Sequence, residues 1–323
     1  MLLASDTLLI VIAALLFDAL IGDPDFVWRR IPHPVVWIGA AIGFLERHLN
    51  RTAWSPQQRK IAGVATVIVL VGGAAIIGFF LEDLLRRRWY GIVAAGFLAS
   101  VLIAQQSLYR HVARVRDAFA DGGLVAARQA VAMIVGRDPE RLDEAGVSRA
   151  AIESTAENFS DGIVAPAFWL ALFGLPGLIA YKAINTADSM IGHRSARYQS
   201  FGWAAARLDD LVNLIPARIS GLLIALVAPI VHGSIGKSLT IMVRDAPKHR
   251  SPNAGWPEAA MAGALGIALA GPRRYAEGTV DDPFLNAEAR KEAIPADIGH
   301  ALDLFVAACL LQAAIYAALW LLS

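Results

Sequence analysis

Long apolar runs without charged side chains alternate with short polar segments along this chain. The clearest run, residues 61–81, contains no charged residue. Because a helix rises about 1.5 Å per residue, about 20 apolar residues are enough to cross a bilayer. The pattern predicts four membrane-spanning helices, near residues 7–22, 61–81, 89–108 and 301–322. We expect residues 7–22 to be retained, since they lack the basic start and cleavage site of a secretory signal.

Two further apolar segments contain helix breakers. Residues 163–181 include Pro166 and a Gly-Leu-Pro-Gly sequence, and residues 211–231 include Pro216 and Pro229. Backbone groups freed by a break are tolerated at membrane depth only where protein or enclosed water satisfies them. Both segments are therefore predicted to be broken or re-entrant helices.

The stretch 109–162 is polar but keeps a helical periodicity. Val112 and Val115 recur at helical spacing, Gly122 and Gly123 interrupt the pattern, and Ser148 is a predicted N-cap of a later helix. Residues 23–60 carry six Lys or Arg and residues 109–162 carry seven, which places both on the cytoplasmic side by the positive-inside rule. We expect one membrane domain over 1–323, with 109–162 as a cytoplasmic helical insertion.

The composition supports a membrane protein. The 323 residues are 56% hydrophobic and 18% charged, with a mean hydropathy of +0.51, whereas soluble domains carry about 25% charged residues. The 29 Lys and Arg balance 28 Asp and Glu, which argues against a nucleic-acid partner, and the single cysteine, Cys309, excludes an intrachain disulfide. We predict an all-α, polytopic integral membrane protein of the cell (inner) membrane.

Ionisable residues gather where the apolar segments end or break. Such groups are costly beside or inside a membrane, so each is a candidate for function. We favour function for Asp18, whereas a purely structural role is as well supported for Asp23 and for His33 in Pro-His-Pro. Before the first broken segment stand four polar residues, Glu153, Glu157, Asn158 and Asp161. We interpret Glu153 as part of a solvated helix face and the others as lining the mouth of that segment.

The densest cluster directly follows residue 181. Lys182, Asn185 and Ser189 share one helix face, Asp188 is about 100° from Ser189, and Thr186 adds a hydroxyl. Carboxylates and amides suit Mg²⁺, while lysine and hydroxyls suit phosphate oxygens. The cluster indicates a phosphate and Mg²⁺ site; the structural alternative is a lysine that reaches to the membrane surface.

A similar set of side chains follows about twenty residues later. Asp209 and Asn213 are four residues apart, and Arg207 and Asp210 are three apart, so each pair shares a helix face. Arg218 lies inside the second broken segment and needs an anionic partner, either a carboxylate or a ligand phosphate. The alternative is an internal ion pair that holds a broken helix.

The last polar cluster surrounds a predicted turn at Ser-Pro-Asn-Ala-Gly, residues 251–255. Asp245 and His249 are four residues apart, a spacing used by metal ligands and by ordinary pairs alike. Asn253 lies in the turn and Glu258 follows it. The nearby Gly-Ser-Ile-Gly-Lys-Ser has two residues between its glycines, where a phosphate-binding Walker A loop has four.

Six ordered motifs carry a family resemblance that extends from about residue 15 to residue 270. They are Asp18 with Gly22-Asp23-Pro24, Pro32-His33-Pro34-Val35, Ala156-Glu157-Asn158 with Asp161-Gly162, Lys182 to Gly192, Ala206 to Arg218, and Ser251 to Glu258. Together they resemble the CobD/CbiB family of adenosylcobinamide-phosphate synthases. His193 departs from the pattern, since an aromatic residue is expected at this position.

The resemblance implies an ATP- and Mg²⁺-dependent amide ligase of cobalamin biosynthesis. Its substrates are a corrinoid, adenosylcobyric acid, and an aminopropanol or its phosphate ester, with the carboxylate activated by the ATP γ-phosphoryl group, as in an acyl phosphate. The resemblance implies metal binding by Asp188, Asp209 and Asp210, with Asp161 as a fourth ligand. It implies contact with ATP or with the substrate phosphate by seven residues: Lys182, Asn185, Thr186, Ser189, Arg207, Arg218 and Asn253. The implied acid–base residue is Glu157 or His249, and Asp161 and Lys182 also belong to the implied catalytic set. The expected active site faces the cytoplasm, and a homo-oligomer is compatible with the sequence.

Three other functions remain open. Broken helices with charged residues are also typical of a secondary transporter, here of a cobamide precursor, although no inverted repeat is visible. A CDP-alcohol type membrane phosphotransferase is a second alternative: Asp161-Gly162 matches the start of its motif, but Pro166 replaces its arginine. A purely structural subunit is the third alternative. It would leave many ionisable side chains, whose placement beside a membrane costs free energy, without a function.

Overall fold

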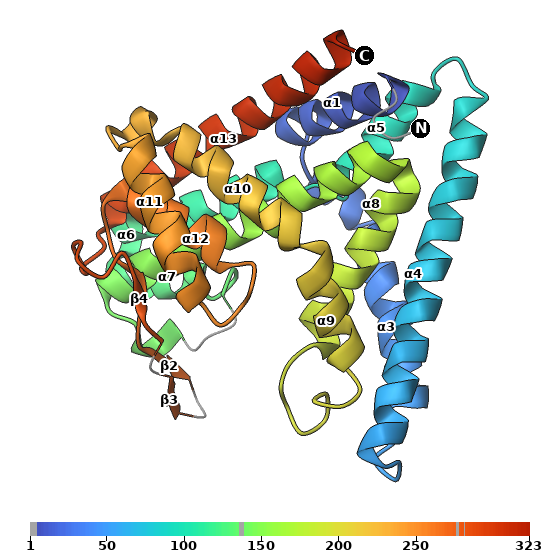
Figure 1. Ribbon diagram of the computed structural model, residues 1–323, viewed down its shortest axis with the longest axis horizontal. Helices are drawn as coiled ribbons and strands as arrows, with labels where there is room; N and C mark the ends of the chain where they lie inside the picture. The colour runs from blue at the N-terminus through green and yellow to red at the C-terminus, as the bar shows by residue number, and fades with distance from the viewer. Residues whose placement is uncertain (1–4, 136–138, 276–277, 281) are drawn as a thin grey trace. The chain divides into compact units, whose positions relative to one another are not determined.

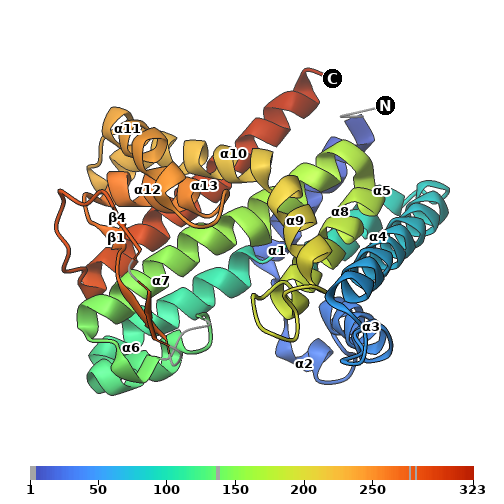
Figure 2. The same cartoon turned by 60° about the horizontal axis from the view of Figure 1, so that its bottom comes forward.

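A computed structural model describes residues 5–135, 139–275, 278–280 and 282–323, and most of them are helical (Figures 1 and 2). The chain divides into two compact units. The first consists of residues 1–104, 165–213 and 316–323, and the second of residues 105–164 and 214–315. Three residues of the predicted insertion at 109–162, residues 136–138, lie outside the described part.

The first unit is built from apolar helices. Its elements are α1 (Ser5–Leu20), α2 (Asp25–Trp28), α3 (Pro34–Leu49), α4 (Pro56–Arg86), α5 (Gly91–Ser100), α8 (Ala165–Ile191) and α9 (Trp203–Val212). Helix α4 packs along α8, and α1 packs on α5. In Figure 1, α9 lies beside the Pro56 half of α4, and α5 lies at its other end.

The second unit combines helices with short strands. Its helices are α6 (Gln105–Val131), η1 (Pro139–Arg141), α7 (Glu144–Phe159), η2 (Ser160–Val164), α10 (Leu214–Leu226), η3 (Ala228–Val231), α11 (Ile235–Asp245), η4 (Ala246–Lys248), α12 (Gly255–Leu265) and α13 (Pro295–Leu321), whose last residues belong to the first unit. Two antiparallel pairs, β1 (Leu269–Ala270) with β4 (Phe284–Leu285) and β2 (Arg273–Tyr275) with β3 (Gly278–Val280), follow α12.

Four helical stretches among the described residues are long and apolar enough to cross a membrane. They are Pro56–Arg86, Gly91–Val131, Glu144–Ile191 and Pro295–Leu321. Three of these overlap the runs predicted at 61–81, 89–108 and 301–322, although the second run is divided between α5 and α6 at residues 101–104. The run at 7–22 does form a helix, but α1 has 16 residues and is shorter than these stretches. The chain is thus a mostly helical protein with four candidate membrane helices.

Helix α4 shows how the local sequence starts a candidate membrane helix. Ser55 is its N-cap: the Ser55 hydroxyl accepts the N–H of Gln58, and the Gln58 side chain accepts the N–H of Ser55. Pro56 occupies the first turn, where its missing N–H has no cost. The uncharged run then continues the helix to Arg86.

The predicted break in residues 163–181 lies at Gly174. This residue has φ +65° and divides α8 into two helices. Glu82 of α4 accepts the freed N–H of Leu175 at 2.7 Å through Oε2, while its Oε1 holds Arg86. A Cβ at Gly174 would lie 2.1 Å from Glu82 Oε2, so glycine is needed for both the backbone conformation and the contact. A protein carboxylate thus satisfies the backbone N–H that the break leaves free, which is the condition under which a broken helix is tolerated at membrane depth.

The insertion contains the predicted interruption but differs from the prediction at two other positions. Gly122 and Gly123 are non-helical within α6, as expected. Helix α7 starts earlier than predicted, with Asp143 as N-cap, so the assignment of Ser148 as cap is wrong. Glu153 is 4% exposed and accepts the N–H of Ala270 at 2.8 Å; its interpretation as solvated surface is also wrong. Asp161 lies in a five-residue π-helical turn, η2.

Candidate functional site

The strongest candidate site of the first unit lies where α9 packs on the last turns of α8. Buried apolar residues hold these helices together and against α3 and α4, and they are Ile42, Ala62, Val67, Leu70, Ala187, Ile191, Phe201 and Ala205. The remaining faces carry the polar residues singled out in the sequence. Helix α8 contributes Lys182, Asn185, Thr186, Asp188 and Ser189, and α9 contributes Arg207, Asp209 and Asp210.

Asp209 is held by a chain of two buried side chains. The Tyr181 hydroxyl donates to Asn213 Oδ1 at 3.0 Å, and Asn213 Nδ2 donates to Asp209 Oδ2 at 3.0 Å. Tyr181 and Asn213 are each 1% exposed. The second oxygen, Asp209 Oδ1, is buried and has no hydrogen-bond partner in the described part of the chain. A buried carboxylate oxygen at such a position is a suitable ligand for a cation or for a hydrogen-bond donor.

The electrostatics at Asp209 also favour a bound cation. Burial and the neighbouring Asp188 carboxylate raise the pKa of Asp209 to about 7, and Asp210 adds to this effect. The nearby Asn213 and Asn185 amides offset it only in part. Three carboxyl groups are therefore close enough to repel one another, an arrangement that a bound cation would relieve.

The acidic residues fit a metal ion that is also bound by water and substrate better than a metal ion bound by protein ligands alone. No group of three or more His, Cys, Asp or Glu side chains within residues 5–135, 139–275, 278–280 and 282–323 is arranged to hold a metal ion alone. Mg²⁺ commonly takes one or two protein carboxylates and completes its shell with water and substrate phosphate. A buried carboxylate oxygen without a partner beside further carboxylates meets that requirement.

The other polar side chains of the cluster have local partners. Thr186 and Ser189 donate their hydroxyls to the carbonyls of Lys182 and Asn185 in the same helix, which leaves only their oxygen lone pairs for a ligand. Arg207 lies 3.3 Å from Asp210 Oδ2 and is otherwise exposed. Their three-residue spacing thus brings the two side chains together on one face of α9.

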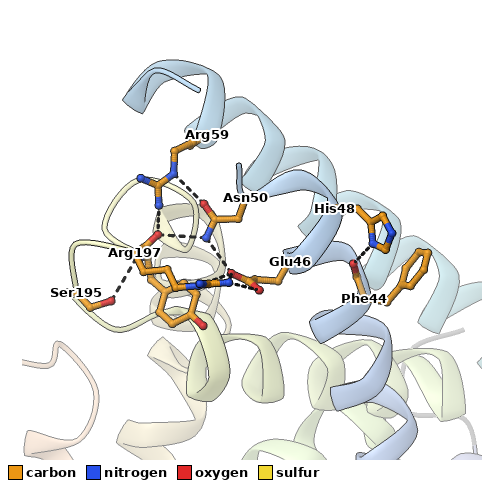
Figure 3. A network of polar contacts seen from close by, with 8 residues as sticks. Phe44, Glu46, His48, Asn50, Arg59, Ser195 and Arg197 are labelled. Atoms are coloured by element: carbon orange, nitrogen blue, oxygen red, sulfur yellow. Dashed lines mark hydrogen bonds and ion pairs between the residues drawn. The ribbon is translucent and has the colours of Figure 1, made fainter. Parts of the chain in front are cut away.

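The loop that joins α8 to α9, residues 192–202, is tied down next to this cluster. A Cβ at Gly192 would lie 2.0 Å from Asp188 Oδ1, so the loop backbone passes directly over that carboxylate. Figure 3 shows the anchor: Arg197 binds Glu46 through two hydrogen bonds of 2.8 and 3.0 Å. Asn50 and Arg59 both donate to the Arg197 carbonyl.

Removing the anchor should loosen the loop. Glu46→Gln keeps the side-chain shape but removes the charge from the bidentate pair, which we expect to cost about 1–2 kcal/mol of local stability. Hydrogen exchange of residues 192–202 should then increase. Glu288→Gln is the matched control, because Glu288 is 86% exposed and lies 3.7 Å from Arg244. Equal exchange in both variants would show that the pair does not hold the loop.

The aspartate and histidine of the first motifs are structural neighbours. His33 is the N-cap of α3 and accepts the N–H of Val35 through Nδ1, while Nε2 lies 3.5 Å from Asp23. The His33 ring also packs edge-on against Trp28 at 4.6 Å. These contacts agree with a purely structural role for Asp23 and His33. Asp18 is 2% exposed inside the first unit.

The second unit carries the remaining candidates. Glu157 is exposed on α7, and the Asn158 amide donates to the Ser154 carbonyl of the same helix. Asp161 lies in the π-helical turn η2, a conformation common at functional sites. Thus Glu157 and Asp161 lie one short helical turn apart in this unit.

Arg218 has an aromatic partner that sequence reasoning missed. Its guanidinium stacks over the ring of Trp256 at 4.3 Å and donates to the Leu214 carbonyl at 2.6 Å. Stacking leaves the edges of the guanidinium available for an anion while the face is covered. An arginine in an apolar helix does signal a partner, but the sequence pattern alone pointed to a carboxylate or phosphate.

His249 and Asn253 frame the turn before α12. His249 Nδ1 accepts the N–H of Ser251 at 3.1 Å, and Nε2 lies 3.7 Å from Glu258 Oε1. Glu258 and Asn253 are buried, at 2% and 6% exposure. The turn predicted at residues 251–255 is present directly before α12.

Asp245, the other half of the predicted pair, is a structural residue. It is fully buried, which disfavours its charge, but Arg244, Lys248 and the N–H of Asn286 hydrogen-bond to it and hold the pKa of its carboxyl well below the usual range. Asp245 thereby fixes the αL residue Asn286 beside α12. It does not pair with His249, despite the four-residue spacing.

Comparisons with known proteins agree with the family resemblance. The model of the CobD/Cbib protein family matches residues 11–305. The cobalamin biosynthesis protein CobD of Sinorhizobium sp is 51% identical over 96% of this chain and 97% of its own length. The protein of the same name from Brucella suis biovar 1 (strain 1330) is 52% identical over 92% of this chain and 92% of its own length. The one from Rhodobacter capsulatus is 49% identical over 97% of this chain and 98% of its own length. No solved structure matches this chain.

Proposed function

Because the chain belongs to the CobD/CbiB family of cobalamin biosynthesis, an adenosylcobinamide-phosphate synthase family, we propose that it is an ATP-dependent amide ligase. It joins the propionate carboxylate of adenosylcobyric acid to an aminopropanol or aminopropanol phosphate. Family membership supports the corrinoid substrate, and the candidate membrane helices support contact with lipid.

The observation that carries the proposal is the carboxylate cluster around Asp209. A carboxylate is a poor electrophile, so amide formation needs phosphoryl activation, and phosphoryl transfer depends on a metal and on cations around the developing charge. Asp188, Asp209 and Asp210 supply a partnerless buried oxygen and crowded negative charge, which suit Mg²⁺. When bound, ATP and Mg²⁺ supply the activating phosphoryl group and its charge neutralisation.

The other proposed roles follow from residue chemistry. Asp161 is the additional metal ligand of the proposal. Lys182 and the cationic and polar groups of the same motifs would contact ATP or the amino-alcohol phosphate: Asn185, Thr186, Ser189, Arg207, Arg218 and Asn253. Arg207 and Lys182 are the two cations of this set that belong to the same compact unit as the three aspartates.

The described geometry favours Glu157 over His249 as the proton acceptor for the attacking amine. His249 Nδ1 already accepts the N–H of Ser251, and Nε2 faces Glu258. Glu157 is exposed on its helix and is able to approach a substrate amine. His249 then serves to hold the turn that carries Asn253.

We further propose a multi-pass protein of the cell inner membrane whose active site faces the cytoplasm. The basic residues of 23–60 and 109–162 support this orientation. The kink at Gly174 supports a broken helix at 163–181, and the 13-residue α10 supports a segment at 211–231 that is too short to span. The proposal retains one membrane domain with a helical insertion at 109–162, and a homo-oligomer is compatible with it.

The decisive experiment is a reconstituted reaction. Purified protein, adenosylcobyric acid, ATP, Mg²⁺ and either aminopropanol or its phosphate should yield the corresponding cobinamide, detected by mass spectrometry, with stoichiometric cleavage of ATP. Omitting ATP or Mg²⁺ should abolish the product. Uptake of the corrinoid into vesicles without amide formation would instead identify a transporter, and ATP-independent transfer from a CDP-alcohol would identify a phosphotransferase.

A further inference from the structure

A cavity lies in the first unit, at the end of α4 that is next to α5. It has a volume of about 290 Å³ and is formed by α1, the end of α4, the turn at residues 87–90 and the start of α5. Its apolar part is lined by Ile10, Leu85, Ile92 and Ala95. Its polar part consists of Asp6, Glu82, Arg86 and Arg88, so two anionic and two cationic side chains face one space.

These four charges differ in whether they already have partners. Glu82 is held by Arg86 at 2.7 Å and by the N–H of Leu175. Asp6 and Arg88, in contrast, form no ion pair with any other residue that the structure describes. The cavity therefore offers one anion on α1 and one cation in the turn after α4, and both are open to a ligand.

The surroundings of the cavity are those of a membrane surface. Trp89 lines it and is 96% exposed, and Phe80, Leu84 and Val93 nearby are 66%, 56% and 59% exposed. Arginine and tryptophan at the end of a long uncharged helix are typical of the level of lipid headgroups. An occupant at this position has its polar part beside Arg88 and its apolar part beside exposed hydrocarbon.

The cavity is separate from the carboxylate cluster. Lys60, near the start of α4, lies 3.7 Å over the ring of Trp203 at the start of α9. Glu82 follows 22 residues later on the same helix, which corresponds to roughly 33 Å along the axis. Figure 1 shows α9 and α5 at opposite ends of α4.

We propose that this cavity binds the headgroup of an aminophospholipid, with the phosphate at Arg88 and Arg86 and the primary ammonium at Asp6. The balanced charge of the lining favours a zwitterionic headgroup over an anionic one. A carboxylate also distinguishes a primary ammonium, which donates hydrogen bonds, from a quaternary one, which does not. The apolar half of the lining and the exposed side chains around it select a lipid over a water-soluble amino phosphate.

Lipid retention by the full-length protein tests this assignment. The protein is extracted from nanodiscs that contain equal amounts of phosphatidylethanolamine, phosphatidylcholine and phosphatidylglycerol, and its bound lipid is measured by native mass spectrometry. We expect phosphatidylethanolamine to be retained roughly tenfold over the other two, the effect of one or two charge-assisted hydrogen bonds. Arg88→Ala should abolish this preference, and Asp6→Asn should abolish discrimination against phosphatidylcholine.

Arg87→Ala is the matched control. Arg87 is adjacent in sequence but pairs with Asp83 and does not line the cavity. The preference should survive in this variant. Equal lipid retention by Arg88→Ala and Arg87→Ala, or retention of phosphatidylglycerol equal to that of phosphatidylethanolamine, would overturn the proposal. Equally tight binding of soluble phosphoethanolamine would overturn the assignment to a lipid. Neither readout depends on ligase activity.

Discussion

Asp209→Asn is expected to lower the rate of cobinamide formation by about 100- to 1,000-fold while the protein remains folded. The change keeps the shape of the side chain, so Asn213 and Tyr181 can still hold it in place. It removes the negative charge from the one buried oxygen of the cluster that has no partner. The rate of amide formation at saturating ATP and Mg²⁺ measures the effect.

A second carboxylate provides the control for this substitution. Asp83→Asn alters an aspartate that pairs with Arg87 at the far end of α4, and it should leave the rate unchanged. If Asp209→Asn retained the wild-type rate, Asp209 would have no part in binding the metal. A loss of equal size in both variants would indicate a general defect in folding or insertion.

The pKa of Asp209 gives this prediction a readout that does not require turnover. Its folded-state pKa of about 7 lies above the ordinary value of 3.8, so the folded protein binds the extra proton more tightly than the unfolded chain does. The stability from this group is complete below pH 3.8 and is lost as the pH rises through about 7. Without metal, Asp209→Asn should therefore melt higher than wild type at pH 8, by about 2 °C or more.

Mg²⁺ should reverse the order of the two proteins. The ion binds the ionised carboxylate and stabilises the folded wild type, but it gains little from an amide. Thermal melting at pH 8 with and without Mg²⁺ separates the two effects. A wild type whose melting temperature does not respond to Mg²⁺ would contradict the metal site even if the variant is inactive.

The features that follow local rules could be predicted from the sequence. An uncharged run long enough for a bilayer became α4, and a Gly-Leu-Pro-Gly sequence became the break at Gly174. The four-residue spacing of Asp209 and Asn213 predicted that they share a helix face, where their side chains form a hydrogen bond. In each case neighbours in the chain determine the outcome through helix geometry, which sequence spacing encodes directly.

Features that depend on distant residues could not be predicted in this way. Glu153 resembled a surface glutamate until Ala270, more than one hundred residues later, was found to donate its N–H to it. Tyr181 is one aromatic residue at the end of an apolar run, and nothing in that run shows that it supports Asp209 through Asn213. The contribution of such residues depends on tertiary packing, for which periodicity carries no information.

Gly63→Ala should destabilise the protein, whereas the same substitution at Gly72 in the same helix should not. In an exposed helix, alanine is favoured over glycine by about 0.5–1 kcal/mol, so propensity alone predicts a gain at both positions. At Gly72 no atom lies within 4 Å of the added Cβ, and we expect that gain. At Gly63 the Cβ would lie 1.8 Å from the Phe201 carbonyl oxygen, a backbone atom that cannot rotate away.

The consequence at Gly63 reaches the candidate site. Phe201 is fully buried between α4, α8 and α9, and the helix that carries Asp209 begins two residues later. Relief of the overlap must move this backbone, which we expect to cost about 2–4 kcal/mol and to lower amide formation together with stability. Thermal melting of both variants in detergent measures the difference. Equal stability of Gly63→Ala and Gly72→Ala would mean that α4 does not approach the 192–202 loop as closely as described. It would then also contradict the position of Asp209 relative to α4.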